Sequence, residues 1–223
     1  MSKIAILSHE VVGAELAILG EWADARGHEI TRYFREQKWD AQDVLAADLL
    51  ILLGSPNSVS TGYEHPSSPQ EIELVKTRIE SDQPYFGICY GSQIMARALG
   101  GEVNRREEKN IGFKKITSES PDVHEGSWML WHEDFIDPTS INKIPGVEIL
   151  ATDVGAAIAF RKGKAWAVQF HPESDSGSLG RMVERIGVPQ EKWEPISEAM
   201  KEDEVNLRER SFALFDQVFS PQN

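Results

Sequence analysis

The sequence predicts an α/β protein: an open, mostly parallel sheet with helices on both faces. Short apolar runs alternate with segments of helical spacing along the first hundred residues. One apolar run, residues 48–53, is unbroken, which is typical of a central parallel strand that is buried on both faces. Two of the apolar runs, residues 48–53 and 84–88, end in turns rich in glycine. We expect these turns at one edge of the sheet, because parallel strands end there and ligands bind beyond their carboxyl ends.

The first half of the chain provides the parallel strands and their helices. Apolar residues at helical spacing stop at Gly27, which predicts a helix end. Ser68 can cap the next helix, and Pro69 fits its first turn. We predict strands at 3–7, 28–34, 48–53 and 84–88, and helices at 13–26, 68–79 and 92–99.

The second half is richer in strands and then becomes helical. Runs at 147–152, 156–161 and 164–170 predict a small antiparallel sheet, with Lys162-Gly163 as a tight turn. Residues 174–178 indicate a loop, and helices follow, interrupted by Gly187, Pro189 and Pro195, with the last one at about 207–219. We expect one domain, 1–223, with a catalytic core at 1–175 and a helical extension at 176–223. The extension either packs on the sheet or, around 176–205, forms a lid or docking surface.

Composition excludes several classes of function. The 223 residues carry 23 Lys and Arg against 36 Asp and Glu, a net charge of −13, which argues against nucleic acids and anionic membranes as partners. One cysteine cannot form an internal disulfide, and no CxxC metal motif exists. No signal peptide is recognisable, and no apolar run approaches the ~18 residues of a membrane span. We expect a cytoplasmic protein without a metal or cofactor.

The single cysteine, Cys89, lies in Gly87-Ile88-Cys89-Tyr90-Gly91, between an apolar strand and a helix. Flanking glycines permit the sharp turn of a nucleophile elbow, here with cysteine in the place of serine. A thiol at a helix N-terminus has a lowered pKa, and the thiolate is the nucleophile. Inert packing is the ordinary alternative for a lone cysteine, but a core cysteine does not require two glycines.

A cysteine nucleophile benefits from a base and from a group that orients the base. Among six histidines, His171 ends an apolar strand and precedes Pro172-Glu173, so Glu173 can reach its ring. The alternative is a plain strand-end histidine. Oxyanion donors are expected from the backbone N–H of Tyr90 and from the Gly54-Ser55 turn, which is otherwise a simple strand-to-helix connection.

Together these motifs resemble the class I (triad) glutamine amidotransferase family, which pairs a Gly-x-Cys-x-Gly elbow with a His-Pro-Glu segment. Within that family, the sequence motif Gly-Ile-Cys-Tyr-Gly-Ser-Gln is most similar to the corresponding motif in the glutaminase domain of GMP synthases. The resemblance runs from residue 3 to about 173 and implies a flavodoxin-like sheet. It implies that Gln93, and the segment containing Trp131, His132 and Asp134, bind the substrate.

The resemblance implies hydrolysis of the side-chain amide of glutamine through a cysteinyl thioester, which yields glutamate and ammonia for a separate synthase. It implies Cys89 as nucleophile, His171 as acid and base, and Glu173 as the residue that orients it. Two alternatives stay open: a stand-alone γ-glutamyl hydrolase that uses the same triad, and a non-catalytic member with a binding or regulatory role. The chain has no room for an ATP-pyrophosphatase domain and no Gly-x-x-x-x-Gly-Lys loop, so we do not expect a complete GMP synthase.

Three positions depart from the family pattern. Ser55 replaces the second glycine of a Gly-Gly-Pro loop, and serine tolerates fewer backbone conformations, so this peptide is less able to flip. Asn110 lies where relatives often have glutamate, and Trp131 replaces the serine before His132. These changes affect details of the substrate pocket and leave the triad intact.

Overall fold

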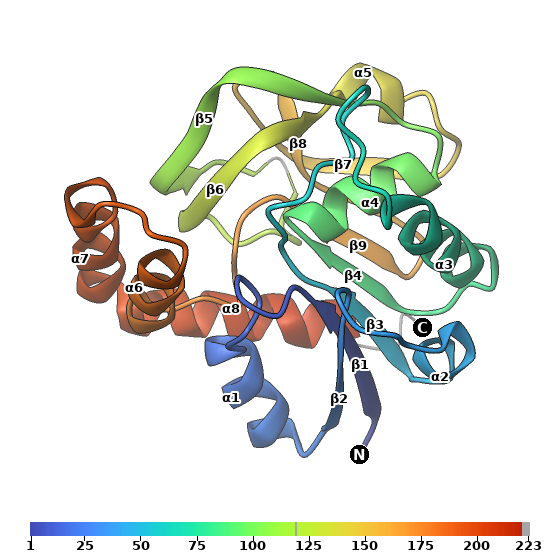
Figure 1. The fold of residues 1–223 in the computed structure, drawn as a ribbon, viewed down its shortest axis with the longest axis horizontal. Coiled ribbons are helices and arrows are strands. Elements are labelled where there is room, and N and C mark those ends of the chain that lie inside the picture. Colours follow the sequence, from blue (N-terminus) through green and yellow to red (C-terminus); the bar gives the residue numbers. More distant parts are fainter. Residues whose placement is uncertain (119, 220–223) are drawn as a thin grey trace.

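A seven-stranded sheet forms the centre of the protein in a computed structural model that describes residues 1–118 and 120–219 (Figure 1). Its strands are β1 (Lys3–Ser8), β2 (Glu29–Phe34), β3 (Leu49–Leu52), β4 (Tyr85–Ile88), β7 (Val147–Asp153), β8 (Ala156–Lys162) and β9 (Ala165–Val168). The spatial order is β2-β1-β3-β4-β9-β8-β7. The first five strands of this order run parallel, and β8 and β7 continue it in antiparallel pairs. The predicted open, mostly parallel sheet is confirmed.

Five helices belong to the first part of the fold: α1 (Ala17–Arg26), α2 (Ala41–Leu45), α3 (Ser68–Glu80), α4 (Tyr90–Ala98) and α5 (Pro138–Ile141). The sequence pattern did not predict the short helices α2 and α5. Helix α1 begins at Ala17 and not at 13. The expected cap at Ser68 is wrong, because Ser68 is already helical and Ser67 is the N-cap residue. The hydroxyl of Ser67 instead donates to Glu71 Oε1 at 3.3 Å.

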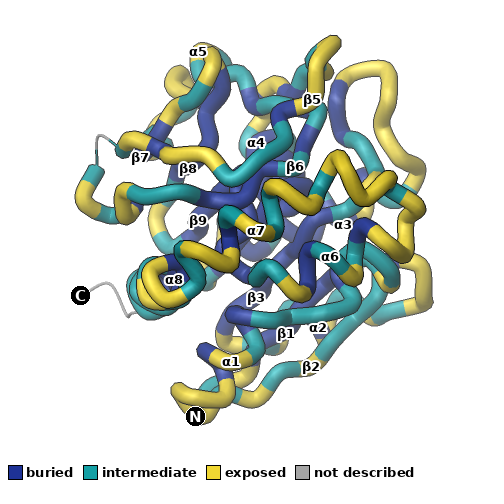
Figure 2. The backbone as a smooth tube through the Cα atoms, turned by 90° about the vertical axis from the view of Figure 1, so that its left-hand side faces the viewer, coloured by how far each residue is buried: buried dark blue, intermediate teal, exposed yellow. Residues whose placement is uncertain are grey.

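Alternate residues of the central strands face two apolar layers. On β1, Ile4 and Ile6 pack with α1, whereas Ala5 and Leu7 pack in the layer that contains α3 and α4. Figure 2 shows buried backbone in the middle of the molecule, where the inner strands of this sheet lie, whereas the edge strand β2 is half-buried or exposed. Burial on both faces explains why β3, predicted from its unbroken apolar run, is fully buried.

A second, two-stranded antiparallel sheet is formed by β5 (Val103–Ile116) and β6 (Gly126–Ile136). No strands were predicted here, because the charged residues at 105–109 obscure the alternation of apolar and polar residues that marks a strand. The pairing register shifts between Arg105 and Asn110, which bends β5. The strands expected to form the small antiparallel sheet, at 147–170, are antiparallel as predicted, but they extend the main sheet.

The extension consists of α6 (Ser176–Arg185), a 3₁₀ turn (Gln190–Lys192), α7 (Glu194–Glu202) and α8 (Glu204–Phe219); residues 220–223 lie outside the described part. The expected loop at 174–178 is shorter than predicted, because Asp175 and Ser178 form a capping box that starts α6. Pro195 lies in the first turn of α7 and does not interrupt a helix. Helix α8 packs on the sheet beside α1, where Phe215 contacts Trp22 and Phe86. Within 1–118 and 120–219, no helix is long and apolar enough to cross a membrane.

Helix α4 begins in close contact with β3, and we predict that Gly91 tolerates no side chain. A Cβ atom at Gly91 would lie 2.1 Å from the carbonyl oxygen of Leu52. Gly91→Ala should therefore lower the free energy of unfolding by about 3 kcal/mol in urea titrations. Gly20→Ala is the control, because its Cβ would meet only the Leu16 side chain, at 3.3 Å. Position 20 lies in a helix, where alanine is more favourable than glycine. A Gly91→Ala protein as stable as the parent would contradict this packing.

Candidate active site

Cys89 occupies a strained turn at the carboxyl end of β4, as the elbow motif predicts. Its φ of 52° and ψ of −106° are rare for a residue with a side chain. The turn is held by hydrogen bonds: Cys89 N–H donates to Val168 O at 2.8 Å, and Ser92 Oγ donates to Cys89 O at 2.5 Å. Gln169 Nε2 donates to the same Ser92 hydroxyl at 2.8 Å. These bonds fix the elbow, and Cys89 is 5% exposed.

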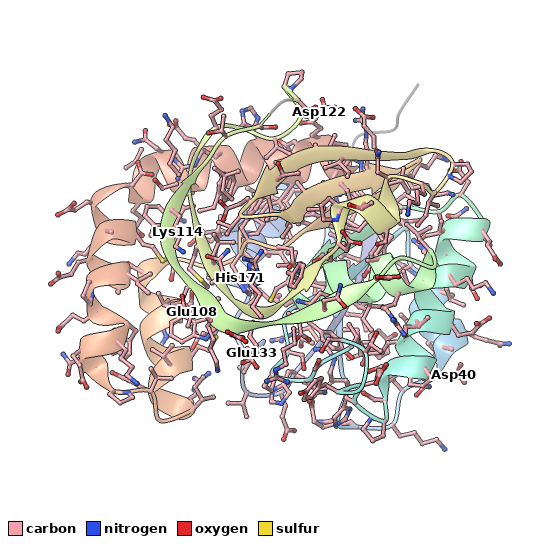
Figure 3. The ribbon with its side chains drawn as sticks, turned by 90° about the horizontal axis from the view of Figure 1, so that it is seen from above. Asp40, Glu108, Lys114, Asp122, Glu133 and His171 are labelled. Carbon is pink, nitrogen blue, oxygen red and sulfur yellow. The ribbon has the colours of Figure 1, made fainter. Side chains whose placement is uncertain are left out.

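His171 follows the neighbouring strand β9, so it reaches the same edge of the sheet as Cys89. Its backbone N–H donates to Met129 O at 2.9 Å, which ties it to β6. Its ring Nδ1 lies 2.7 Å from Glu173 Oε1, and both residues are 6% exposed. Viewed from above, His171 lies within the bend of β5 and β6 (Figure 3). The structure thus brings the three predicted catalytic residues together.

The pKa of His171 is raised well above its ordinary value. Burial alone would lower this pKa, but the Glu173 carboxylate and the Cys89 thiol together outweigh burial and favour the imidazolium. The other ring nitrogen, Nε2, is buried and makes no hydrogen bond of normal geometry with a described residue. Catalytic hydrogen bonds are often long before substrate binds.

The Gly54-Ser55 turn lies against both residues. A Cβ at Gly54 would stand 3.1 Å from His171 Cε1 and 3.8 Å from Cys89 Cβ. Among the described residues, the backbone N–H groups of Ser55 and Tyr90 donate to no protein acceptor. Free N–H groups beside a nucleophile are the donors that an oxyanion requires.

The predicted substrate-binding residues line one pocket of about 240 Å³ next to Cys89: Gln93, Trp131, His132 and Asp134. Cys89 Sγ lies 3.9 Å from Trp131 O, which connects the pocket to the elbow. Ser58 Oγ donates to Asp134 Oδ2 at 2.5 Å, and Gln93 Nε2 donates to Asp134 O at 3.3 Å. The pocket wall opposite the sheet is therefore built by β6.

His132 is held neutral inside this wall. Its Nδ1 donates to Asp134 O at 2.8 Å, so Nε2 is the acceptor and faces Asn110 Nδ2 at 3.4 Å. Burial lowers its pKa to about 4, against a smaller opposing effect of the Asp134 carbonyl. His132 is therefore a poor candidate for a general base near neutral pH.

Among the pocket residues that sequence reasoning missed are Arg105 and Lys109 on β5, and Ile186 after α6. Both cations pair with Glu133 on β6, Lys109 at 3.1 Å. No local motif marks these positions, because the bend of β5 and the end of α6 bring them together. Within 1–118 and 120–219, no three His, Cys, Asp or Glu side chains are arranged to hold a metal ion.

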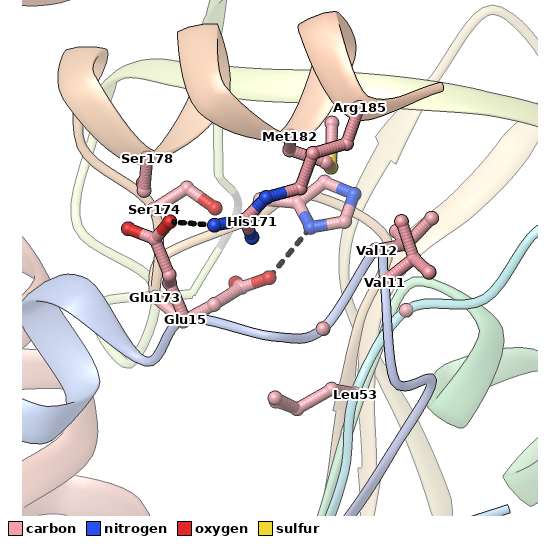
Figure 4. Close-up of a pocket in the computed structure, with 12 residues that line it drawn as sticks. Val11, Val12, Glu15, Leu53, His171, Glu173, Ser174, Ser178, Met182 and Arg185 are labelled. Atoms are coloured by element: carbon pink, nitrogen blue, oxygen red, sulfur yellow. Dashed lines mark hydrogen bonds and ion pairs between the residues drawn. The ribbon is translucent and has the colours of Figure 1, made fainter.

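Helix α6 lies against the His171–Glu173 pair. A cavity of only about 20 Å³ is lined there by Met182 and Arg185 of α6 together with His171 and Glu173 (Figure 4). Arg185 pairs with Glu15 at 3.2 Å, which fastens α6 to the loop after β1. The extension therefore shields the pair from bulk water.

Comparison of the sequence with known families gives a match to the family model "Glutamine amidotransferase class-I", which covers residues 21–187. GMP synthase [glutamine-hydrolyzing] of Vibrio cholerae is 34% identical over 160 residues, 66% of this chain and 29% of that protein. The enzyme of the same name from Pyrobaculum aerophilum is 37% identical over 141 residues, 60% of this chain and 26% of that protein. The chain thus spans less than a third of the length of these relatives.

Solved structures share the fold. A glutamine amidotransferase from Thermotoga maritima superimposes with a TM-score of 0.84 at 20% identity, covering 99% of both chains. A glutamine amidotransferase from Methylobacillus flagellatus gives a TM-score of 0.79 at 15% identity, covering 98% of this chain and 94% of that one.

We predict that His132 makes the protein less stable in acid. Between pH 6.5 and about 4 the unfolded chain protonates this histidine while the folded chain does not, so stability is lost as the pH falls through this range. The loss is about 3 kcal/mol for this shift. His132→Asn, which keeps a donor for Asp134 O, should lose less stability between pH 7 and pH 4.5 in urea titrations. Equal losses in parent and variant would contradict the assignment.

Proposed function

Because this chain belongs to the class I glutamine amidotransferase family, we propose that it hydrolyses the side-chain amide of glutamine through a cysteinyl thioester. The observation that carries the proposal is the strained Cys89 elbow beside the buried His171–Glu173 pair. Such strain is maintained at functional sites because the surrounding structure holds it. Hydrogen bonds to both the N–H and the carbonyl of Cys89 fit this pattern.

In the first half of the proposed reaction, the Cys89 thiolate attacks the amide carbon and forms the S–C bond, and the carbonyl electrons move to oxygen. The N–H groups of Tyr90 and Ser55 stabilise that oxyanion. The imidazolium of His171 then gives its proton to the amide nitrogen, the C–N bond breaks, and ammonia leaves. The raised pKa of His171 supports this role, because it keeps the proton available.

In the second half, water attacks the thioester carbon while His171 accepts its proton. The tetrahedral intermediate breaks the C–S bond, releases glutamate and regenerates Cys89. Glu173 stabilises the imidazolium and fixes which ring nitrogen faces the sulfur. His171 thus carries the proton that the leaving ammonia takes and the proton that the attacking water gives up, and the new carboxylic acid loses its remaining proton to solvent.

The pocket supports a zwitterionic amino acid as substrate. It is lined by cations from β5, Arg105 and Lys109, and by the acids Glu133 and Asp134 from β6. Charges of both signs beside Cys89 suit the α-carboxylate and α-ammonium of glutamine. A γ-glutamyl compound carries the same head group, so this feature alone favours neither substrate.

We further propose that the ammonia serves a separate synthase. The matching GMP synthases are more than three times the length of the aligned segment, so their remaining parts have no counterpart in this alignment. The Thermotoga maritima amidotransferase, in contrast, is matched over 99% of its chain. A glutaminase of this kind should turn over glutamine slowly alone and faster with its synthase.

Substitutions of the three residues test the assigned roles. Cys89→Ser should abolish glutamate release while leaving the thermal midpoint nearly unchanged. His171→Ala removes the proton carrier and should cost about 10³-fold or more in kcat, whereas Glu173→Gln misorients it and should cost less. Steady-state assays of ammonia release measure all three. A larger effect of Glu173→Gln than of His171→Ala would show that the roles are wrongly assigned.

A substrate panel separates the glutaminase from a stand-alone γ-glutamyl hydrolase. The purified chain is assayed with glutamine and with γ-glutamyl dipeptides, and Cys89→Ser is the blank. A glutaminase should release glutamate from glutamine and reject bulky leaving groups. Faster hydrolysis of the dipeptides would favour the γ-glutamyl hydrolase. If neither substrate is hydrolysed and Cys89 also resists a glutamine-like alkylator, the result would favour a non-catalytic protein.

A further inference from the structure

A buried ion pair lies directly behind the Gly54-Ser55 turn, and the proposed reaction does not use it. The side chains of Arg35, after β2, and Glu71, on α3, are each 1% exposed and lie 3.2 Å apart. Burying two charges costs desolvation energy, and an apolar pair of similar size is often as stable. A buried pair is therefore weak evidence for a purely stabilising role, and its contacts need another explanation.

Arg35 contacts the main chain of the turn. Its guanidinium donates to Gly54 O at 3.2 Å and to Leu53 O at 3.3 Å. Glu71 accepts from the guanidinium on the other side and fixes its plane. The planar fork of arginine suits this arrangement, because it donates in several directions at once.

The direction of the Gly54 carbonyl determines the direction of the next N–H. The Gly54–Ser55 peptide is trans, so its C=O and N–H point to opposite sides. With the carbonyl turned to Arg35, the Ser55 N–H points away from Arg35. The α-carbon of Gly54 faces Cys89 and His171, and Ser55 lines the pocket next to them.

The same pair also contacts the other proposed donor. Tyr90 lies with its ring under the Arg35 guanidinium, 4.8 Å from ring centre to Cζ, and its hydroxyl donates to Glu71 Oε1 at 3.4 Å. Its main chain begins α4 directly after the nucleophile. Arg35 and Glu71 thus touch the residues on both sides of the expected oxyanion.

We propose that Arg35, held in place by Glu71, is a positioning residue that keeps the Ser55 N–H directed at the oxyanion of the substrate. The inference rests on the proposed glutamine hydrolysis. It means that the oxyanion site is already formed in the free chain and needs no rearrangement of this peptide. Serine at position 55, in place of a second glycine, restricts the same peptide further.

The test is a double variant, Arg35→Met with Glu71→Leu, which removes both charges and leaves neither one unpaired in the core. We expect kcat for glutamine to fall by about 10²-fold, the usual cost of one oxyanion donor, with KM little changed. Alkylation of Cys89 by iodoacetamide should keep its rate and its pH profile. That reaction forms an S–C bond and expels iodide, and no carbonyl oxygen becomes negative.

Arg78→Met is the matched control. Arg78 is also buried, 2% exposed, and donates to the carbonyls of Leu45, Ala47, Asp48 and Pro84, outside the site. It should lower the thermal midpoint and leave kcat within about twofold of the parent. Arg35→Lys is the second variant if the double variant does not fold. Lysine keeps a positive charge beside Glu71 but lacks the several planar donors of the guanidinium, so this variant should lower kcat about tenfold.

Each outcome has a distinct meaning. A loss in kcat with unchanged alkylation supports positioning by Arg35. Unchanged kcat, a change in KM alone, or a parallel loss of kcat and alkylation overturns it. A parent chain that does not hydrolyse glutamine contradicts the proposed function itself, and this inference is then rejected with it.

Discussion

The hydrogen bond from Cys89 N–H to Val168 O joins the ends of two parallel strands, and the candidate site depends on it. Strands β4 and β9 are paired from Tyr85–Ala165 to Ile88–Val168, so both end at the same level. The residue after β4 is the nucleophile candidate, and the histidine follows β9 by three residues. Ordinary strand pairing thereby brings distant parts of the chain to the same edge of the sheet. A shift of register by one residue would turn every side chain of β9 to the opposite face.

Much of this site was predictable because its parts are local in sequence. Five consecutive residues encode the elbow, and the spacing of His171 and Glu173 already allows their contact. The strands and most helices of the first half were predictable for a related reason: each buries one recognisable apolar pattern. Errors there concern the five-residue helix α2, which is too short to show a periodic pattern, and the helix starts, where capping depends on side-chain geometry that the pattern does not encode.

The remaining features depend on pairing between distant segments. The β5–β6 sheet was missed because the charges of 105–109 face solvent and Glu133, not a core. Arg35 and Glu71 gave no signal, since an arginine after a strand and a glutamate in a helix are usually exposed. Only the three-dimensional structure shows that both are buried beside the turn, where Arg35 joins Glu71 of α3 to the carbonyl of Gly54. The start of α6 was misread because a serine–glycine run resembles a loop, although Asp175 caps it.

The two sheets contribute different parts of the candidate site, and this has an evolutionary consequence. The main sheet holds Cys89 and His171, whereas Trp131, His132 and Asp134 come from a hairpin that pairs only with itself. Substitutions of the pocket-lining side chains of that hairpin can change the shape of the pocket while the β4–β9 pairing and the main-chain bond from His171 N–H to Met129 O stay in place. Relatives with this fold can therefore differ in the residues that line the pocket while the placement of the cysteine and the histidine stays the same.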